Sequence, residues 1–575
     1  MKTIKYSIIT IIFSLFTSCI VDIDLEEMPK DFFSPENSFT DKAGFESSLA
    51  DLYQNIRKEM YMAEDQAKTW GMMGMDIDFN CWRTNDAADG SKNYNEIWYW
   101  NTINKDNPEV KNWWIRFYGW IYKANVIIGR AEDGDIQWTP EEKDQIVAEA
   151  KFLRAFAYHF LVNCWGDVPL VLEETTGPKF DYTRAPKEQV LQQCVTDLEW
   201  AVSYMITVDK QPGGRAPRAA AYHLLSEVYI MTGEYQKSIE AASKVIDDPN
   251  YHLMTERFGT RTNFRFNGYD YQGEYEVWGD VYWDLFQEGN MNWSEGNREC
   301  IWNIQMDVDM QGGGKTTEWG GNFGLERHWT PDWWRATDID GVQAWLKDTL
   351  NGRPNGTTQP TEYVGDRIWK YKDDWDKDIR NSEYNVQRDF YWTNPANTYY
   401  GQRMEPEHMG DKSTYEKLTR PSFKKGVSAV HYGLYQDPAS GQNQDQGRIF
   451  KDWYIMRLAE TYLLRAEAYM LSGNVQKAAD DINVVRGRAK ATPVTAADVN
   501  IDLILDERAR ELYMEEFRTN TLMRTGKLVE YLMKYNDAVI LRGYQLPAFK
   551  NKFPIPQSEI EANKEAILYQ NEGYE

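Results

Sequence analysis

The sequence is poor in the residues that usually build metal sites and disulfide frameworks. It contains five cysteines and six histidines in 575 residues. Apart from Cys19, the cysteines stand at 81, 164, 194 and 300, too sparse for a disulfide scaffold and without the short spacings of a zinc site. We therefore expect no zinc centre. Cys164 and Cys194 lie in helical patterns and are interpreted as small buried apolar residues, although an oxidising compartment would allow a bridge.

Basic residues are also few relative to acidic ones. Lysine and arginine together number 64 against 89 aspartates and glutamates, so the formal net charge is -25. Nucleic acids and anionic lipid surfaces are polyanions that need neutralisation by basic side chains. The charge therefore argues against a nucleic-acid partner, and it favours a neutral ligand over a sulfated one.

Recognisable catalytic motifs are missing. We find no His/Ser/Asp spacing, zinc-binding helix or phosphate loop above background. Glycosidases need two carboxylates about 5 to 10 Å apart, but among 89 acidic residues such pairs arise by chance. We expect a protein that is not an enzyme, with a helical glycan-degrading enzyme as the less favoured alternative.

No apolar run at the N-terminus is long enough to span a bilayer. Lys2 and Lys5 precede an apolar stretch over 8–16, and the small residues Thr17 and Ser18 then lead to Cys19. This order is typical of a secretory signal. The segment "LFTSC" resembles a bacterial lipobox, with Phe16 where leucine is commonest. We expect a signal peptide over 1–18, lipid acylation of Cys19 and a tether over 19–40; an ordinary signal peptide is the alternative.

Helical patterns dominate what the sequence does contain. Thr139, Pro140 and Glu142 provide an N-cap, a proline at the first helical position and a capping-box glutamate. Apolar residues at steps of three and four then predict a long helix that ends near "CWGDVP". A second amphipathic helix is predicted through Ile455, Leu458, Tyr462, Ala466 and Tyr469.

Two distant segments echo each other. "LLSEVYIMTGEYQKS", from Leu224, and "LLRAEAYMLSGNVQKA", from Leu463, superpose when Gly233 is aligned with Gly473. Each is predicted to be a helix, a glycine turn in the left-handed conformation and a second helix. This is a degenerate tetratricopeptide pattern. Such pairs either bind proteins or only hold a fold together, and the sequence leaves both open.

Periodicity is lost between about 251 and 445. The segment is rich in Gly, Asn, Asp, Trp and Tyr, as in "MQGGGKTTEWGGNFG" and "HWTPDWWRATD". We interpret it as a loop-rich insertion with short strands and helices. Long loops on a rigid scaffold often carry binding residues.

Five blocks, in order along the chain, resemble the SusD/RagB family of Bacteroidetes outer-membrane lipoproteins. They are "AEAKFLRAFAYHFLVNCWGDVPLV", "RAPRAAAYHLLSEVYIMTGEYQKSIEAASKVI", "IMRLAETYLLRAEAYMLSG", "ILDERARELYMEEFR" and "FPIPQSEIEANKEAILYQNEGY". The departures are local. Glu516 replaces a glycine, Thr519 and Thr521 replace Trp and Asp, and Glu572 replaces the terminal proline; all lie in structural segments.

The resemblance implies a mainly α fold, in which tetratricopeptide-like helix pairs form a right-handed superhelical scaffold with long irregular loops and a few short strands. Residues 41–575 would form one domain. It implies a non-catalytic surface protein, anchored through lipid to the outer membrane and facing the cell exterior. Such a protein captures an oligo- or polysaccharide for a SusC-like TonB-dependent barrel transporter; capture of peptides is the alternative within the family.

The family blocks are scaffold, so ligand residues have to be nominated from chemistry. Sugar binders pair exposed aromatic planes with polar groups that fix orientation. "NEIWYWN", at 95–101, places two indoles on one face if it is extended. For each tryptophan the alternative is a place in the core, and for Asp76 and Asp78 it is a weak Ca²⁺ site; no cofactor or metal is predicted. Our candidates are Asp76, Asp78, Arg83, Trp98, Trp100, Asn101, Trp283, Trp319 and Trp333.

Overall fold

A computed structural model describes most of the chain. The described residues are 38–62, 75–80, 100, 102–132, 136–266, 274–308, 310, 313, 323–329, 331, 333–344, 356, 358–428, 435–436, 443–444 and 449–575. The predicted signal peptide, Cys19 and almost all of the predicted tether lie outside these ranges.

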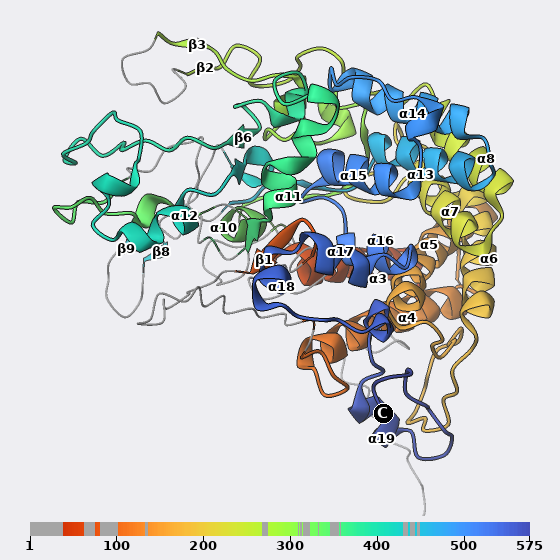
Figure 1. Ribbon diagram of the computed structural model, residues 1–575. Helices are drawn as coiled ribbons and strands as arrows, with labels where there is room; N and C mark the ends of the chain where they lie inside the picture. Colours follow the sequence, from red (N-terminus) through yellow and green to blue (C-terminus); the bar gives the residue numbers. More distant parts are fainter. Residues whose placement is uncertain are drawn as a thin grey trace, which may run out of the picture.

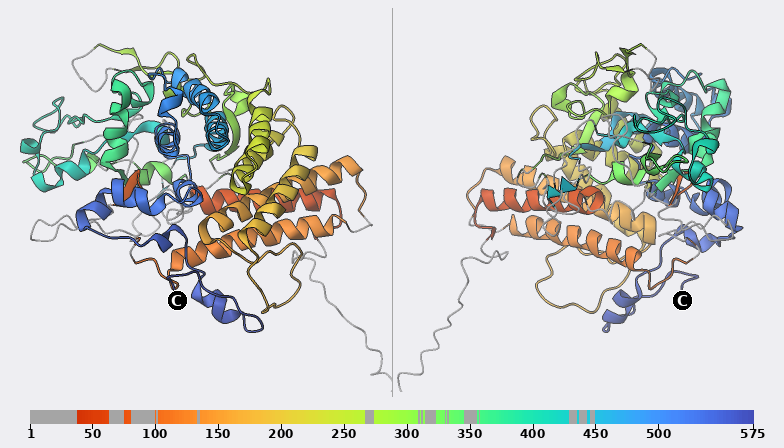
Figure 2. Two further views of the ribbon diagram at one scale, coloured as in Figure 1. Left: turned by 45° about the vertical axis from the view of Figure 1, so that its right-hand side comes forward. Right: turned by 90° about the vertical axis from the view of Figure 1, so that its left-hand side faces the viewer.

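A row of helices forms one side of the molecule (Figures 1 and 2). Each helix packs against the next in the chain, so that neighbours bury one another's apolar faces. The predicted capping box of α5 is present, and this helix ends at Trp165, as expected. The row consists of α3 (Lys42–Arg57), α4 (Pro108–Arg130), α5 (Pro140–Trp165), α6 (Lys187–Tyr204), α7 (Arg218–Thr232) and α8 (Tyr235–Ile246).

The insertion leaves the row after α8, and the chain then returns to it. Helices α13 (Leu458–Leu471) and α14 (Val475–Arg488) pair with each other, and α13 packs directly on α8. Gly233 and Gly473 end the first helix of each pair with φ of +79° and +83°. The left-handed turns and the tetratricopeptide-like pairs predicted from the sequence are therefore confirmed.

The start of α13 differs from the prediction. Ile455 belongs to strand β10 (Trp453–Arg457), and the helix begins only at Leu458. β10 pairs antiparallel with β4 (Cys300–Ile304), all of whose residues are buried. Because strand and helix here are both apolar and continuous in sequence, their periodicities merge into one apparent helical pattern.

The insertion is built of short elements, as predicted. It lies on the opposite side of the molecule from helices α4, α5 and α6 (Figure 2). Its strands pair in twos, β2 with β3, β6 with β7 and β8 with β9, while β5 pairs with β1, which precedes α4 in sequence. The strands are β1 (Asp78–Asn80), β2 (Arg265–Phe266), β3 (Glu276–Val277), β5 (Thr358–Pro360), β6 (Val386–Gln387), β7 (Ser422–Phe423), β8 (Tyr435–Gln436) and β9 (Asn443–Gln444); the α-helices are α9 (Val281–Asp284), α10 (Leu325–Trp329), α11 (Glu362–Gly365) and α12 (Tyr415–Leu418).

The C-terminal part returns to pack on the helices already described. It contains α15 (Ile501–Leu512), α16 (Arg518–Arg524), α17 (Leu528–Tyr535), α18 (Asp537–Arg542) and α19 (Gln557–Ala562). Helix α16 packs on α5. The backbone N–H of Phe553 donates to the carbonyl of Cys164, which fastens the tail to the end of α5.

Charged residues of α15 are buried in a network of ion pairs. Arg457, at the end of β10, donates to Glu299, Glu511 and Glu515 at 2.7 to 2.8 Å. Burial raises the pKa of the Glu507 carboxyl, but Arg380, Arg486 and Arg510 outweigh it and lower that pKa to about 2. Buried charges require such partners, because an unpaired one would be very costly. The network fixes α15 against β4 and β10.

The burial of Cys164 and Cys194 agrees with the sequence analysis. Cys164, Cys194 and Cys300 are buried free thiols. Within the described residues, no helix combines the length and apolarity needed to cross a membrane.

Candidate functional site

Several of the predicted ligand residues lie outside the described part of the chain. They are Arg83, Trp98, Asn101 and Trp319. Three of them stand at 83–101, close in sequence to the described residues Asp76 and Trp100, which are both packed against the body of the protein. These four candidates remain predictions.

Asp76 and Asp78 are buried within the fold. Both oxygens of Asp76 accept from the Arg518 guanidinium, at 3.0 and 2.6 Å, and both side chains are fully buried. Asp78 accepts from the backbone N–H of Met75 and starts strand β1. Among the described residues, no group of three acidic, histidine or cysteine side chains could hold a metal ion. The structure therefore favours packing roles over ligand or Ca²⁺ contacts for both aspartates.

The described candidate tryptophans are also buried. Trp100 is 4% exposed and stacks on Phe553, with ring centroids 5.8 Å apart and planes at 6°. Trp283 packs among Trp278 and the 264–266 strand region, and Trp333 packs against Phe390. These placements favour the core alternative, since a ligand cannot reach the ring faces.

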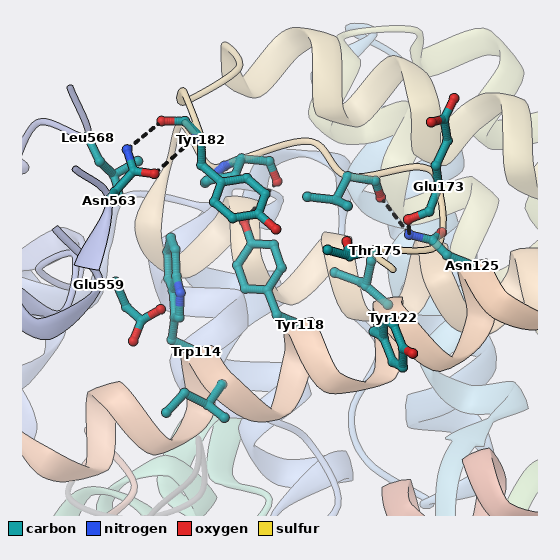
Figure 3. A pocket seen from close by; sticks show the side chains of 14 residues that line it. Trp114, Tyr118, Tyr122, Asn125, Glu173, Thr175, Tyr182, Glu559, Asn563 and Leu568 are labelled. Carbon is teal, nitrogen blue, oxygen red and sulfur yellow. Dashed lines mark hydrogen bonds between the residues drawn. The ribbon is translucent and has the colours of Figure 1, made fainter. Parts of the chain in front are cut away.

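An accessible aromatic pocket lies elsewhere, on the outer face of α4 (Figure 3). Trp114, Tyr118 and Tyr122 follow one another at steps of four and therefore share one face of the helix. Trp114 is nearly buried, whereas Tyr122 is 40% exposed. The cavity has a volume of about 330 Å³. It is lined by Trp114, Ile115, Tyr118, Ile121, Tyr122, Asn125, Pro169, Val171, Glu173, Thr175, Tyr182, Glu559, Asn563 and Leu568.

Hydrogen bonds from behind hold the pocket walls in place. Asn125 donates to the carbonyls of Val171 and Glu173, at 3.0 and 3.2 Å. Asn563 bonds both the backbone N–H and the carbonyl of Tyr182, each at 2.8 Å (Figure 3). The two asparagines thus fix the loop between α5 and α6 against α4 and the C-terminal tail.

The pocket is aromatic and weakly acidic. Glu173 and Glu559 contribute carboxylates, and none of the described residues that line it is lysine or arginine. The Tyr118 hydroxyl donates to the carbonyl of Pro169 at 2.8 Å, and burial raises its pKa well above the usual range. The arrangement suits a neutral or cationic ligand with a flat apolar face.

Sequence reasoning missed this pocket, because three distant segments form it. A signal was nevertheless present in "NWWIRFYGWIYKANV", where the aromatic stripe of α4 continues to the exposed Tyr122. An ordinary core stripe would end in buried residues.

A larger, polar groove runs between α3, the turn at 213–215 and β4, with a volume of about 1020 Å³. Burial raises the pKa of the Asp452 carboxyl in this groove to about 6, with Glu295 and Asp307 contributing. Its oxygens accept from the Met306 N–H and the Asn292 amide, at 2.8 and 2.6 Å. These bonds explain Asp452 as a structural group.

Comparisons with known proteins connect this architecture to a family. Residues 298–574 match the model described as "SusD family", and residues 32–230 match one described as "Starch-binding associating with outer membrane". The chain belongs to the SusD/RagB family.

Individual SusD relatives agree over most of the chain. It is 22% identical to SusD-like protein P25 of Formosa agariphila over 97% of both chains. It is 25% identical to the starch-binding protein SusD of Bacteroides thetaiotaomicron over 83% of both. Its fold resembles surface glycan-binding protein A of B. thetaiotaomicron in complex with laminarihexaose. The TM-score is 0.64 at 20% identity, covering 92% of this chain and 100% of that one.

Several residues of the SusD/RagB sequence motifs form buried ion pairs in the structure. Glu507, Arg508 and Glu511 of "DERAREL" belong to the buried ion-pair networks of α15. Glu516, which stands where the family usually has glycine, pairs with Arg508 at 2.5 Å and accepts from Thr521 at 2.7 Å. Two departures from the family pattern, Glu516 and Thr521, therefore contact each other.

Proposed function

We propose that the protein is a non-catalytic glycan-binding lipoprotein of the cell surface, anchored to the outer membrane through acylated Cys19. It captures a neutral oligo- or polysaccharide and delivers it to a SusC-like TonB-dependent transporter. The observation that carries the proposal is the match of residues 32–230 to the starch-binding, outer-membrane-associated model. The relatives named for starch and for laminarihexaose support a glycan as ligand.

Arg83, Trp98, Asn101 and Trp319 are the proposed ligand residues. The buried neighbours Asp76 and Trp100 would act as anchors, because they tie this part of the chain to Arg518 and Phe553. Aromatic faces would stack on the sugar, while the guanidinium and amide fix its hydroxyl groups.

The proposal excludes chemistry on the glycan. Among the described acidic residues, Asp452 has a pKa suited to proton transfer, but its carboxyl oxygens accept two internal hydrogen bonds. We therefore expect the bound polymer to be released unchanged.

Isothermal titration calorimetry tests this function with the Cys19→Ser chain and a panel of starch, β-glucan and hemicellulose oligosaccharides. We expect saturable binding of at least one glycan, with no new reducing ends in the recovered ligand. Release of reducing ends would support the enzyme alternative. Failure to bind any glycan, together with co-purified oligopeptides in the mass spectrum, would replace glycan capture by peptide capture.

A further inference from the structure

The aromatic pocket on α4 has no role in the function proposed above. In sequence, the candidate ligand residues belong to the insertion and to the segment before α4, whereas the pocket joins α4, the loop at 169–182 and the C-terminal tail. Its rings line up along α4 (Figure 3). Its features therefore need an explanation of their own.

The pocket walls are preorganised. The side-chain amide of Asn125 donates to the backbone carbonyls of Val171 and Glu173. Its oxygen accepts from Arg154 at 2.8 Å. Asn563 is fully used by Tyr182 and Ala566. A ligand would thus meet a shape that already exists, which lowers the entropic cost of binding.

Two kinds of group face a ligand in this pocket. One is the set of ring faces, with Tyr122 exposed and Tyr118 and Tyr182 half-buried. The other is the Glu559 carboxylate, which forms no ion pair within the described part of the chain, whereas the Glu173 carboxylate lies at the rim and points away from the rings (Figure 3). Ionised carboxylates only accept hydrogen bonds, and sugar hydroxyls are donors that match them.

The size and charge of the pocket restrict its ligand further. A volume of about 330 Å³ is at the lower end of the ~300–1,000 Å³ range of ligand pockets, enough for about one or two sugar rings. Uronic acids and sulfated sugars would be repelled by the two carboxylates, because no basic side chain among the described lining residues compensates them.

We propose that this pocket is a second sugar-binding site, which stacks a neutral pyranose on Tyr122 and Tyr182 and hydrogen-bonds its hydroxyls through Glu559. The inference rests on the proposed glycan capture and extends it. Two separated contacts on one polysaccharide raise the effective concentration at each site, so a polymer is held more tightly than a short oligosaccharide.

Hydrogen–deuterium exchange on the Cys19→Ser chain measures whether a bound ligand protects the backbone amides of the pocket. The probes are laminarihexaose and maltohexaose, with a sulfated β-glucan oligosaccharide as the anionic comparison. A neutral hexasaccharide is expected to protect peptides that cover 169–182 and 557–568, and the sulfated one is not. Tyr122→Ala and Tyr182→Ala should each weaken this protection on the order of tenfold in ligand concentration, as expected for loss of one stacking ring.

Tyr204→Ala is the matched control. Tyr204 is also 40% exposed, but it lies on α6 outside the pocket, so protection and affinity should stay at the wild-type level. Trp98→Ala and Trp319→Ala test independence, because they should leave protection at 169–182 intact.

The results separate the two proposals. If wild-type protein binds a neutral glycan by calorimetry but the pocket peptides stay unprotected, the second site is wrong and glycan capture stands. If the tyrosine variants match Tyr204→Ala in every glycan titration, the second site is equally refuted. If wild-type protein binds no glycan at all, both proposals fall together.

Discussion

At the residue scale, burial decides what each aromatic side chain does. The sequence contains 23 tryptophans, and their number suggested ligand platforms. Many of them fill the core instead: Trp113, Trp120, Trp165, Trp329, Trp333, Trp369, Trp392 and Trp453 are among the largest fully buried side chains. Trp100 joins them because Phe553, far along the chain, provides its stacking partner. No local pattern in "NEIWYWN" predicts the contact between Trp100 and Phe553.

Trp100 and Trp98 form a matched pair of substitutions. Trp100→Ala is expected to lower the free energy of unfolding by about 3–5 kcal/mol, as for other large-to-small changes in a core. Trp98→Ala is expected to weaken glycan binding with little change in stability, as for a platform residue. Urea unfolding and calorimetry on both variants check this. A stable Trp100→Ala protein with lost affinity would return Trp100 to the ligand site.

Asp76 is predicted to be structural. Asp76→Ala leaves the Arg518 guanidinium buried without its bidentate partner, so we expect a loss of about 3–5 kcal/mol in unfolding free energy. The control is Asp51→Ala, whose side chain is 52% exposed and should change stability by less than about 1 kcal/mol. Equal stability of the two variants in urea would contradict the burial argument.

At the scale of elements, the sequence predicts local features well where one signal acts alone. The capping box at Thr139 and the turns at Gly233 and Gly473 depend only on neighbouring residues, and all three are present. The misplaced start of α13 shows the limit. Whether Ile455 is strand or helix depends on β4, which lies about 150 residues earlier in sequence, and periodicity cannot report such pairing.

The glycine turns can be tested separately from packing. A Cβ at Gly233 or Gly473 meets no atom within 4 Å, but φ is +79° and +83°. Alanine at either position should therefore cost about 1–2 kcal/mol from backbone strain alone. Gly487 lies within α14 with equally open space, so Gly487→Ala should stabilise by up to about 1 kcal/mol. Thermal melts in which all three variants shift alike would contradict this.

The buried network of α15 predicts acid sensitivity. Burial raises the pKa of Glu460, but Arg508 and His223 lower it to about 2. The pKa of Glu507 is lowered in the same way by Arg380, Arg486 and Arg510. For carboxyls with a depressed folded-state pKa, the stabilisation is complete above pH 4.5 and is lost as pH falls toward 2.

We therefore expect the free energy of unfolding in urea to fall steeply between pH 4.5 and pH 2, on the order of 3 kcal/mol for each such carboxyl. Asp452 acts in the opposite sense only between about pH 4 and 6, where its raised pKa lowers stability as pH rises. Glu530→Gln, which removes an exposed carboxylate, should retain the wild-type profile. An unfolding free energy that stays constant or increases as the pH falls below 4 would contradict this role of the buried network.

At the scale of the whole molecule, the order of five sequence blocks was sufficient to predict the family and the helical scaffold. Those blocks form α5, the α7–α8 pair, β10 with α13, α15 and the C-terminal tail. The accessible surface could not be predicted in the same way. The α4 pocket depends on three segments brought together by Asn125 and Asn563, and each segment alone resembles an ordinary helix face, loop or tail.

The central claim is that the folded chain binds a neutral glycan, and a glycan-array screen of the soluble Cys19→Ser protein tests it most directly. The account predicts selective binding to a set of related neutral glycans, with weaker signals for sulfated and uronic-acid analogues of the same backbone. An array without any specific glycan signal, obtained with protein that unfolds cooperatively, would contradict the claim.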